Sequence, residues 1–431
     1  MDFSKPRFRP IPLFVTATLA LALVHVLSAQ AQTYSVIYNF TGQSDGGNPV
    51  AGLSMDSDGN LYGAAFAYGA HGFGNVYQLA HSGSGWTFSA LYGFRGPYES
   101  DGAEPESRPV FGPDGSLYGT THLGGFGQGC IAWYNGCGTV YSLGNNSGTW
   151  VEDPLFQFGS ANGGYPSYGD VVVDSSGNLY DSSPASGNYY NGVVYELTRA
   201  DRWSESILYS FQGAPDGTAP LDGPLLARGG NLYGTASAGG VNGYGAVYEL
   251  SPSAGGWTET VLYSFTNGND GGAPASNLVV DRAGDLYGAT QTGGTYGGGT
   301  VFQLIPSPAG TWRLNTIYQF RSSALAAPVG TQSGGCAIQG LGSNRTLTID
   351  SAGNLYGTTS GDVLNPWGSV FKLHPVASID WSYTPLHSFT GTTDGGVPWG
   401  SVILDGSGNL YGTAALGGAN SCGVVFEVTM E

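Results

Sequence analysis

A short pattern that recurs along the whole chain constrains its fold more than any other feature. Gly-x-Leu-Tyr occurs seven times, and its successive tyrosines stand 53 to 69 residues apart, at Tyr62, Tyr118, Tyr180, Tyr233, Tyr287, Tyr356 and Tyr411. Residues 350–359 show the motif in full as Asp-Ser-Ala-Gly-Asn-Leu-Tyr-Gly-Thr-Thr. A motif that returns at this period indicates a repeat array, in which each copy is one structural unit.

Each repeat is expected to contain four short strands. In the fifth copy, residues 277–281 and 286–290 are β-rich runs on either side of a turn that contains glycine. Residues 300–304 form a third run and residues 312–320 a fourth. Four short strands per unit, joined by turns, predict the blade of a β-propeller.

The fourth run carries the most regular spacing. A tryptophan and a phenylalanine stand eight residues apart in six repeats, as Trp86 and Phe94, Trp150 and Phe158, Trp203 and Phe211, Trp257 and Phe265, Trp312 and Phe320, and Trp381 and Phe389. In a regular strand an even offset places both side chains on one face. We therefore expect each pair to pack together against the same neighbouring blade.

The two ends of the chain complement each other. The seventh copy ends at Glu431 without a fourth strand, while residues 33–40 match the end of one. The N-terminal strand is therefore expected to complete the last blade and close the ring, which removes open sheet edges. The prediction is an all-β protein, a seven-bladed β-propeller with four antiparallel strands per blade. A β-solenoid is the alternative architecture.

The first 31 residues are expected to be a signal peptide rather than part of the fold. Lys5, Arg7 and Arg9 precede a mostly apolar run, and residues 29–31 read Ala-Gln-Ala, a cleavage site between small residues. The propeller domain would then span 32–431, in a protein that is secreted or lies in the cell envelope. An uncleaved membrane anchor is the alternative, and no later segment is apolar enough to span a bilayer.

Composition narrows the class of partner. Glycine makes up 74 of the 431 residues and charged residues only 10%, which suits strands and tight turns rather than helices. The formal net charge of −18 argues against nucleic acid and against an anionic membrane surface as partners. A monomer is expected.

The repeat motif resembles that of a known family. The pattern Asp-x-x-Gly-Asn-Leu-Tyr-Gly-Thr-Thr, followed by Gly-Gly and then by Gly-Thr-Val-Phe-x-Leu, is similar to the GloVer ("choice-of-anchor") tandem repeats over essentially the whole chain after residue 31. The resemblance implies an exported bacterial protein and carries no assigned activity. The chain ends as Val428-Thr429-Met430-Glu431, directly after a strand, which favours a released protein over an anchored one.

A second repeated motif, Asp-Gly-x-x-Pro, lies between blades. Its carboxylates could form a ring that holds Ca²⁺, the one cofactor candidate, and its aspartates are Asp45, Asp101, Asp216, Asp270 and Asp394. The alternative is structural, with Asp starting a turn, Gly taking a positive φ and Pro fixing the entry to a strand. Because the motif recurs five times, we favour the structural interpretation.

Features that occur once are better candidates for a site. The second repeat has a long insertion with Asp101, Glu104 and Glu106, followed by a loop with Trp133 and Tyr134. Trp367 and Trp399 also fall in segments of the face that we call the top, which carries the inter-blade loops and the loops between strands two and three. Aromatic rings beside carboxylates are common where sugars bind. The alternative is loop packing.

The four cysteines suit an oxidising compartment. Cys130 and Cys137 lie in one loop and are expected to pair. Cys336 and Cys422 fall in top-face segments of adjacent blades, which leaves them as the second pair.

Together these features predict a non-catalytic binding or interaction scaffold whose partner is a glycan or a surface protein. The rival hypothesis is a carbohydrate-active enzyme, a glycoside hydrolase or polysaccharide lyase, with its site on the top face near blade two. A purely structural surface protein is the third interpretation.

Overall fold

The computed structural model describes residues 32–83, 85–97, 101–125, 136–159, 166, 169–199, 203–321, 347–361, 365–377 and 379–430. This part of the chain consists of strands and turns. Within these ranges there is no helix long and apolar enough to span a membrane. The expected signal peptide lies outside them.

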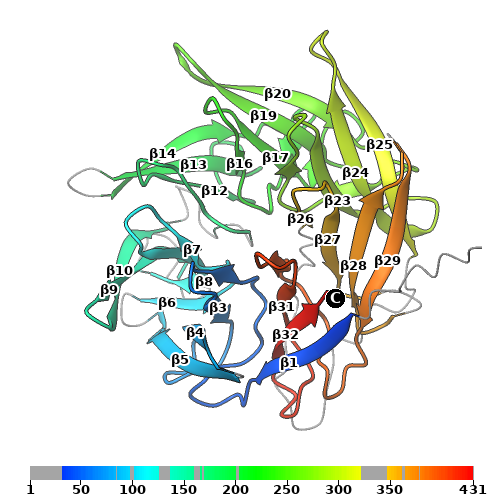
Figure 1. Ribbon diagram of the computed structural model, residues 1–431. Helices are drawn as coiled ribbons and strands as arrows, with labels where there is room; N and C mark the ends of the chain where they lie inside the picture. The colour runs from blue at the N-terminus through cyan, green and yellow to red at the C-terminus, as the bar shows by residue number, and fades with distance from the viewer. Residues whose placement is uncertain are drawn as a thin grey trace, which may run out of the picture.

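Seven small antiparallel sheets stand around a common axis, which confirms the seven-bladed propeller (Figure 1). Blade one contains β2 (Ser54–Met55), β3 (Leu61–Ala65), β4 (Asn75–Ser82) and β5 (Gly85–Gly93). Blade two contains β6 (Gly102–Pro105), β7 (Val110–Phe111), β8 (Leu117–Gly124), β9 (Thr139–Asn146) and β10 (Thr149–Gln157). Blade three contains β11 (Val172–Val173), β12 (Leu179–Ser183), β13 (Val193–Arg199) and β14 (Trp203–Ser210).

The remaining blades follow the same plan. Blade four contains β16 (Leu225–Leu226), β17 (Leu232–Ala236), β19 (Ala246–Ser253) and β20 (Gly256–Ser264), with the small pair β15 (Gly217–Thr218) and β18 (Ala238–Gly239). Blade five contains β21 (Gly272–Pro274), β22 (Val279–Val280), β23 (Leu286–Thr292), β24 (Gly297–Pro306) and β25 (Trp312–Arg321). Blade six contains β26 (Leu347–Ile349), β27 (Leu355–Thr359), β28 (Ser369–Pro375) and β29 (Trp381–Ser388).

Blade seven is built from both ends of the chain. It contains β30 (Ile403–Leu404), β31 (Leu410–Ala414) and β32 (Val424–Thr429), and its outer strand is β1 (Thr33–Asn39). β1 pairs antiparallel with β32, from Thr33 opposite Thr429 to Asn39 opposite Val424, and the two lie side by side in Figure 1. The predicted closure of the ring by the N-terminal strand is confirmed.

The recurring motif forms the hairpin between the first two strands of a blade. In blade one the Asp56 carboxylate accepts hydrogen bonds from the backbone N–H groups of Asp58 and Asn60. The Asn60 amide and the Tyr62 hydroxyl donate to the other oxygen of the same carboxylate. One aspartate therefore fixes the turn and the tyrosine beside it, which explains why these residues recur together.

The glycine after Leu-Tyr is required by a close approach between strands. In six blades a Cβ at this glycine would come within 2.2 to 2.7 Å of the aromatic side chain that the third strand presents. These glycines are Gly63, Gly119, Gly234, Gly288, Gly357 and Gly412. Blade three departs from this rule, because Asp181 takes the place of the glycine.

The fourth strands correct one expectation from the sequence. Trp86 packs against Tyr411 of the preceding blade, whereas Phe94 packs against Tyr141 of the following blade, so the two do not share a face. The cause is a β-bulge in the pairing of strands three and four in every blade. One extra residue reverses the alternation of side chains, so each fourth strand anchors its blade to both neighbours.

Backbone contacts also tie neighbouring blades on the top face. The residue before the proline of each Asp-Gly-x-x-Pro motif has a positive φ, as shown by Glu104 at 58° and Ala273 at 50°. Their N–H groups donate to carbonyls in the top loop of the preceding blade, from Glu104 to Phe73 over 3.0 Å and from Ala273 to Tyr244 over 2.8 Å. The two kinds of top loop therefore form one connected surface.

Candidate functional site

The repeated aspartates of the inter-blade loops each hold their own loop together. Asp45, Asp101, Asp216 and Asp270 each accept a hydrogen bond from the hydroxyl of a fourth-strand tyrosine over 2.9 to 3.0 Å. Each also accepts a bond of 2.8 Å from a backbone N–H group of its loop. Among the described residues, no three His, Cys, Asp or Glu side chains are placed to hold a metal ion together. These contacts favour the turn interpretation over the calcium hypothesis.

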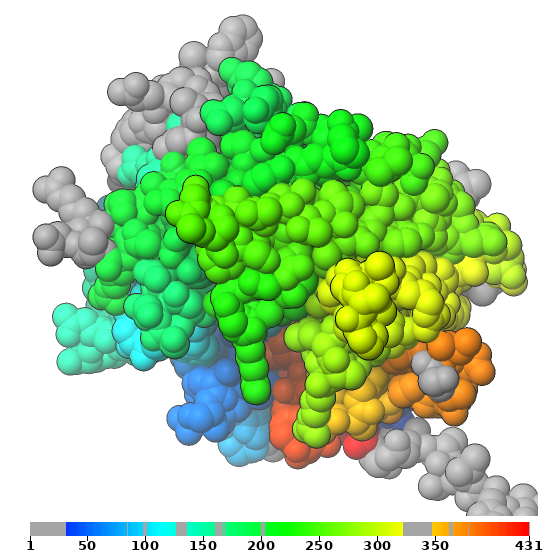
Figure 2. Space-filling model, turned by 90° about the horizontal axis from the view of Figure 1, so that it is seen from above, coloured from blue at the N-terminus to red at the C-terminus, as the bar shows by residue number. Residues whose placement is uncertain are grey.

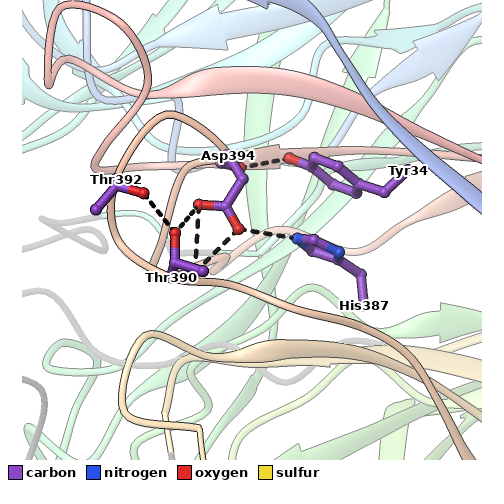
Figure 3. A network of polar contacts seen from close by, with 5 residues as sticks. All are labelled: Tyr34, His387, Thr390, Thr392 and Asp394. Atoms are coloured by element: carbon purple, nitrogen blue, oxygen red, sulfur yellow. Dashed lines mark hydrogen bonds and ion pairs between the residues drawn. The ribbon is translucent and has the colours of Figure 1, made fainter.

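Asp394 occupies the same loop position beside the seam of the ring, where a histidine replaces the tyrosine. His387 Nε2 lies 3.2 Å from Asp394 Oδ2, and Thr390 donates to the same carboxylate from its backbone N–H and its hydroxyl (Figure 3). The Tyr34 ring stacks on His387 with the centroids 3.6 Å apart, and its hydroxyl donates to the Asp394 carbonyl. These contacts attach β1 to blade six.

The residues expected to bind a ligand separate into three groups. Trp133 and Tyr134 lie outside the described residues. Cys130 and Cys336 lie outside them too, so both disulfide bonds stay predictions. Their intended partners Cys137 and Cys422 are buried, and no described cysteine is free. Asp101, Glu104 and Glu106 lie together at the entry to blade two.

Trp367 and Trp399 are half-buried and serve packing. A Cβ at Gly391 would come within 2.1 Å of the Trp367 ring, so this loop glycine lies directly against the indole. Trp399 packs on a small apolar cluster that includes Val50 and Ala415. Most of the surface of both tryptophans is therefore covered by packing, as the alternative interpretation expects. Trp399 also lines a small cavity near the propeller axis.

Polar groups from several blades line a small cavity near the axis of the propeller. Glu106, Asp170, Asn277, Trp399 and Ser401 line a cavity of about 20 Å³ near the propeller axis. Glu106 Oε1 and Asn277 Oδ1 are buried there without a hydrogen-bond partner among the described residues. A space of this size admits one water molecule, which would satisfy such atoms.

One acid of this cavity lies beside a histidine. Glu106 Oε2 lies 3.6 Å from His122 Nδ1, and both side chains are largely buried. Burial, and then the charge of Glu104, raise the pKa of Glu106 well above its ordinary value. Burial lowers the pKa of His122. Both shifts favour the uncharged forms, so a protonated carboxyl lies beside a neutral imidazole.

A cluster of buried acids that the sequence reasoning missed lies where blade three meets blade four. Arg108 pairs with Asp170 over 3.0 Å, and the Tyr195 hydroxyl donates to Asp181 over 3.0 Å. Asp222, 1% exposed, has no hydrogen-bond partner among the described residues for either carboxylate oxygen. Burial, and then the charges of Asp170 and Asp181, raise the pKa of Asp222 to about 8. The signal in the sequence was the loss of glycine at position 181.

The most exposed aromatic rings lie elsewhere on the top face. Four tyrosines in the loops between strands two and three of blades three, four and five are 46 to 79% exposed: Tyr189, Tyr190, Tyr244 and Tyr296. We call this set the tyrosine arc. The Arg321 guanidinium lies 5.2 Å from the centre of the Tyr296 ring. The sequence reasoning missed the arc because tyrosine is also frequent in the strands, where it packs.

Comparison with solved structures gives matches of low similarity. A putative 6-phosphogluconolactonase from Bacteroides uniformis is 16% identical, with 79% of this chain and 84% of that chain covered and a TM-score of 0.47. A putative oxidoreductase (glucose dehydrogenase) from Thermus thermophilus is 16% identical, with coverage of 92% and 100% and a TM-score of 0.43. A gluconolactonase from Xanthomonas campestris is 12% identical, with coverage of 68% and 82% and a TM-score of 0.38.

Comparison with curated protein sequences gives no match. A family model is matched over two overlapping spans, residues 21–204 and 168–334, and its description is the Gloeobacter/Verrucomicrobia repeat. The matched spans contain the repeated hairpins of blades one to five, so the match rests on the motif that organises the fold. The chain belongs to the Gloeobacter/Verrucomicrobia repeat family.

Proposed function

We propose that this protein is an exported, non-catalytic binding propeller that holds a glycan on the tyrosine arc. The observation that carries the proposal is the exposure of four tyrosine rings on equivalent loops of three neighbouring blades. Exposed tyrosines present a flat apolar face and a hydroxyl, which suits the faces and hydroxyl groups of a sugar. Three consecutive blades would offer successive contacts along an oligosaccharide.

The loops of the arc are held in place by backbone hydrogen bonds. Gly192 donates to the Ser186 carbonyl over 3.0 Å, and Gly245 donates to the Gly239 carbonyl over 3.0 Å. Tyr190 itself has a φ of 59°, a conformation that costs a non-glycine residue free energy and that often occurs at binding sites. Rings held in advance lose less conformational entropy when a ligand binds.

A glycan array with the protein lacking residues 1–31 tests this proposal. Each of Tyr190→Ala and Tyr244→Ala is expected to weaken glycan binding roughly 2- to 10-fold, which corresponds to the 0.5–1.5 kcal/mol typical of one aromatic stacking contact. Tyr68→Ala is the matched control, because Tyr68 is an exposed tyrosine at a top loop of blade one, outside the arc. Binding that survives the double substitution Tyr190→Ala/Tyr244→Ala contradicts the proposal, as does the absence of any glycan ligand.

A second candidate is a carbohydrate-active enzyme with its site on the top face near blade two. The contact that favours it is the pair formed by Glu106 and His122, since a protonated carboxyl can donate a proton to a leaving group and a neutral imidazole can accept one from an attacking water or a sugar carbon. A polysaccharide-degradation screen, run with and without Ca²⁺, tests it. Turnover that is lost in Glu106→Gln but kept in Tyr190→Ala would favour the enzyme over the binding scaffold.

A further inference from the structure

A wide groove lies on the bottom face, opposite the tyrosine arc, where blades four, five and six meet. Its volume is about 1070 Å³, and its lining includes Leu225, Arg228, Val280, Arg282, Trp312 and Ile349. The bottom face carries the hairpins between the first two strands of each blade. Figure 2 shows two projections of the green and yellow-green blades at the lower edge of the view, with a hollow between them. The groove is large enough for a ligand of several sugar rings.

Two arginines depart from the repeat at this place. Arg228 and Arg282 occupy the same position of the hairpin turn in blades four and five. The other five blades have small or uncharged residues there, Ser57, Pro113, Ser175, Ser351 and Gly406. Because the fold needs no arginine at this position in five blades, its presence in two neighbouring blades points to a role other than folding.

The two guanidinium groups are available to a ligand. Both arginines are exposed, and the structure gives neither of them an ion pair or a hydrogen bond with another described residue. Arg108 and Arg199, by contrast, are each paired with an aspartate. In a chain with a formal net charge of −18, two unpaired cations side by side are an unusual concentration of positive charge.

The two acids that line the groove make their hydrogen bonds within their own hairpins. Asp281 accepts hydrogen bonds from the backbone N–H groups of Ala283 and Asp285 and from the Tyr287 hydroxyl. Asp350 accepts bonds from Ala352, Asn354 and Tyr356 in the same way. The two exposed guanidinium groups have no partner among the described residues and can only donate hydrogen bonds, so a ligand that pairs with them brings acceptors.

We propose that this groove binds an acidic oligosaccharide, with Arg228 and Arg282 each holding one carboxylate of the sugar chain. Packed sheets lie about 10 Å apart, so guanidinium groups on neighbouring blades suit two anionic groups separated along one extended ligand. Arginine holds a carboxylate with two parallel hydrogen bonds. Trp312 and the aliphatic side chains of the groove offer the apolar surface on which sugar rings stack.

Calorimetric titration of the protein lacking residues 1–31 tests this inference, with unbranched oligomers of galacturonate, glucuronate and mannuronate as probes. We expect at least one of them to bind, and we expect Arg228→Ala/Arg282→Ala to weaken that binding at least 10-fold. Arg228→Lys/Arg282→Lys should keep part of the affinity, and rising salt should weaken the wild type more than the double alanine variant. The methyl ester of the bound oligomer, which has the same skeleton without the charge, should bind as weakly as the acid binds to the double alanine variant.

Two control proteins keep this result separate from the proposal for the top face. Arg199→Ala removes a positive charge from the bottom face outside the groove and should leave binding unchanged, and so should Tyr190→Ala/Tyr244→Ala. The inference is overturned if no uronate oligomer binds at millimolar concentration, or if the double arginine variant binds as tightly as the wild type. It is also overturned if an acidic peptide such as oligoglutamate binds to the groove more tightly than every sugar.

Discussion

Blades two to four and blades five to seven share one backbone plan but fill it with different chemistry. In blades two to four the third strand buries a tyrosine, and the fourth strand places a glutamate opposite the leucine two residues further on. Each glutamate is close enough to influence its tyrosine, giving the pairs Tyr141 and Glu152, Tyr195 and Glu205, and Tyr248 and Glu259. In blades five to seven the same positions are apolar or aromatic, as Phe302 and Leu314, Phe371 and Tyr383, and Phe426 and Tyr34. Figure 2 shows part of both groups side by side, coloured from green to yellow.

The polar group of blades also contains buried carboxyl groups whose pKa values are raised. Burial, and then the charge of Asp101, raise the pKa of Glu152 to about 8. Burial, and then Asp216, raise that of Glu259 to about 7. The buried Asp222 and Glu106, whose pKa values are also raised, belong to the same part of the ring. Buried acids of this kind cost stability and are expected where a protein gains something else from them.

The shared backbone plan therefore does not dictate which side chains fill the interior of a blade. The backbone hydrogen bond that closes each hairpin and the bulge between strands three and four recur in both groups of blades, so these are features of the shared backbone plan. The polar interior coincides with the blades that carry the acid–histidine pair and the buried acids between blades three and four. Three predictions test how far the two groups of blades differ.

The largest effect is expected in the apolar group. Phe302 is fully buried and lies 5.2 Å from Phe265 between their ring centres. Phe302→Ala removes this ring from a well-packed interior and should lower the free energy of unfolding by about 3–5 kcal/mol. Equilibrium unfolding in guanidinium chloride measures it. A loss below about 1 kcal/mol would show that the apolar blades are not packed as described.

An intermediate effect is expected from one hydroxyl of the polar group. Tyr195→Phe removes the hydrogen bond to the buried Asp181 and should lower the free energy of unfolding by about 1.5–3 kcal/mol, since bonds to charged groups are the stronger ones. Tyr248→Phe is the matched control, because the buried Tyr248 hydroxyl has no hydrogen-bond partner among the described residues. It should change stability by less than about 1 kcal/mol. Equal losses in both variants would remove the distinction.

The smallest effect is a dependence of stability on pH that belongs to the polar group. Glu152 has an ordinary pKa of 4.5 and a pKa of about 8 when folded, so the folded state holds its proton more tightly than the unfolded state. Its stabilising contribution is complete below about pH 4.5 and is lost as pH rises to about 8. Glu259 acts in the same direction up to about pH 7.

Thermal unfolding between pH 4 and pH 9 measures this dependence. The unfolding temperature should fall as pH rises, and Glu152→Gln/Glu259→Gln should make the fall shallower, because an amide does not titrate. Asp58→Asn, which changes an exposed carboxyl of blade one, is the control and should leave the slope as it is. A wild-type protein that gains stability from pH 5 to pH 8 would contradict the expectation.

The architecture could be predicted from the sequence because its determinants repeat. Each hairpin is fixed by residues within the same short stretch, such as Asp56, Asn60 and Tyr62, so seven copies reveal seven blades. The closure of the ring followed from a strand missing at one end and present at the other. The bulge in each fourth strand was not predicted, because no residue type marks it and the spacing of Trp86 and Phe94 is the same with or without it.

The candidate sites could be predicted only in part. Glu106 was singled out as an acid outside the repeat, but its contact with His122 depends on how two strands of blade two meet. The tyrosine arc and the groove depend on which equivalent loops are adjacent and exposed, and this is a property of the ring rather than of any stretch of chain. Asp181, Arg228 and Arg282 could have been found by aligning the seven repeats with one another and asking where a residue type changes.

The pairing of β1 with β32 sets the order in which this molecule can be completed. β1 precedes every other strand of the propeller and β32 follows them, so blade seven forms only after β32 has been synthesised. The seam therefore makes closure of the ring the last step in the assembly of the propeller.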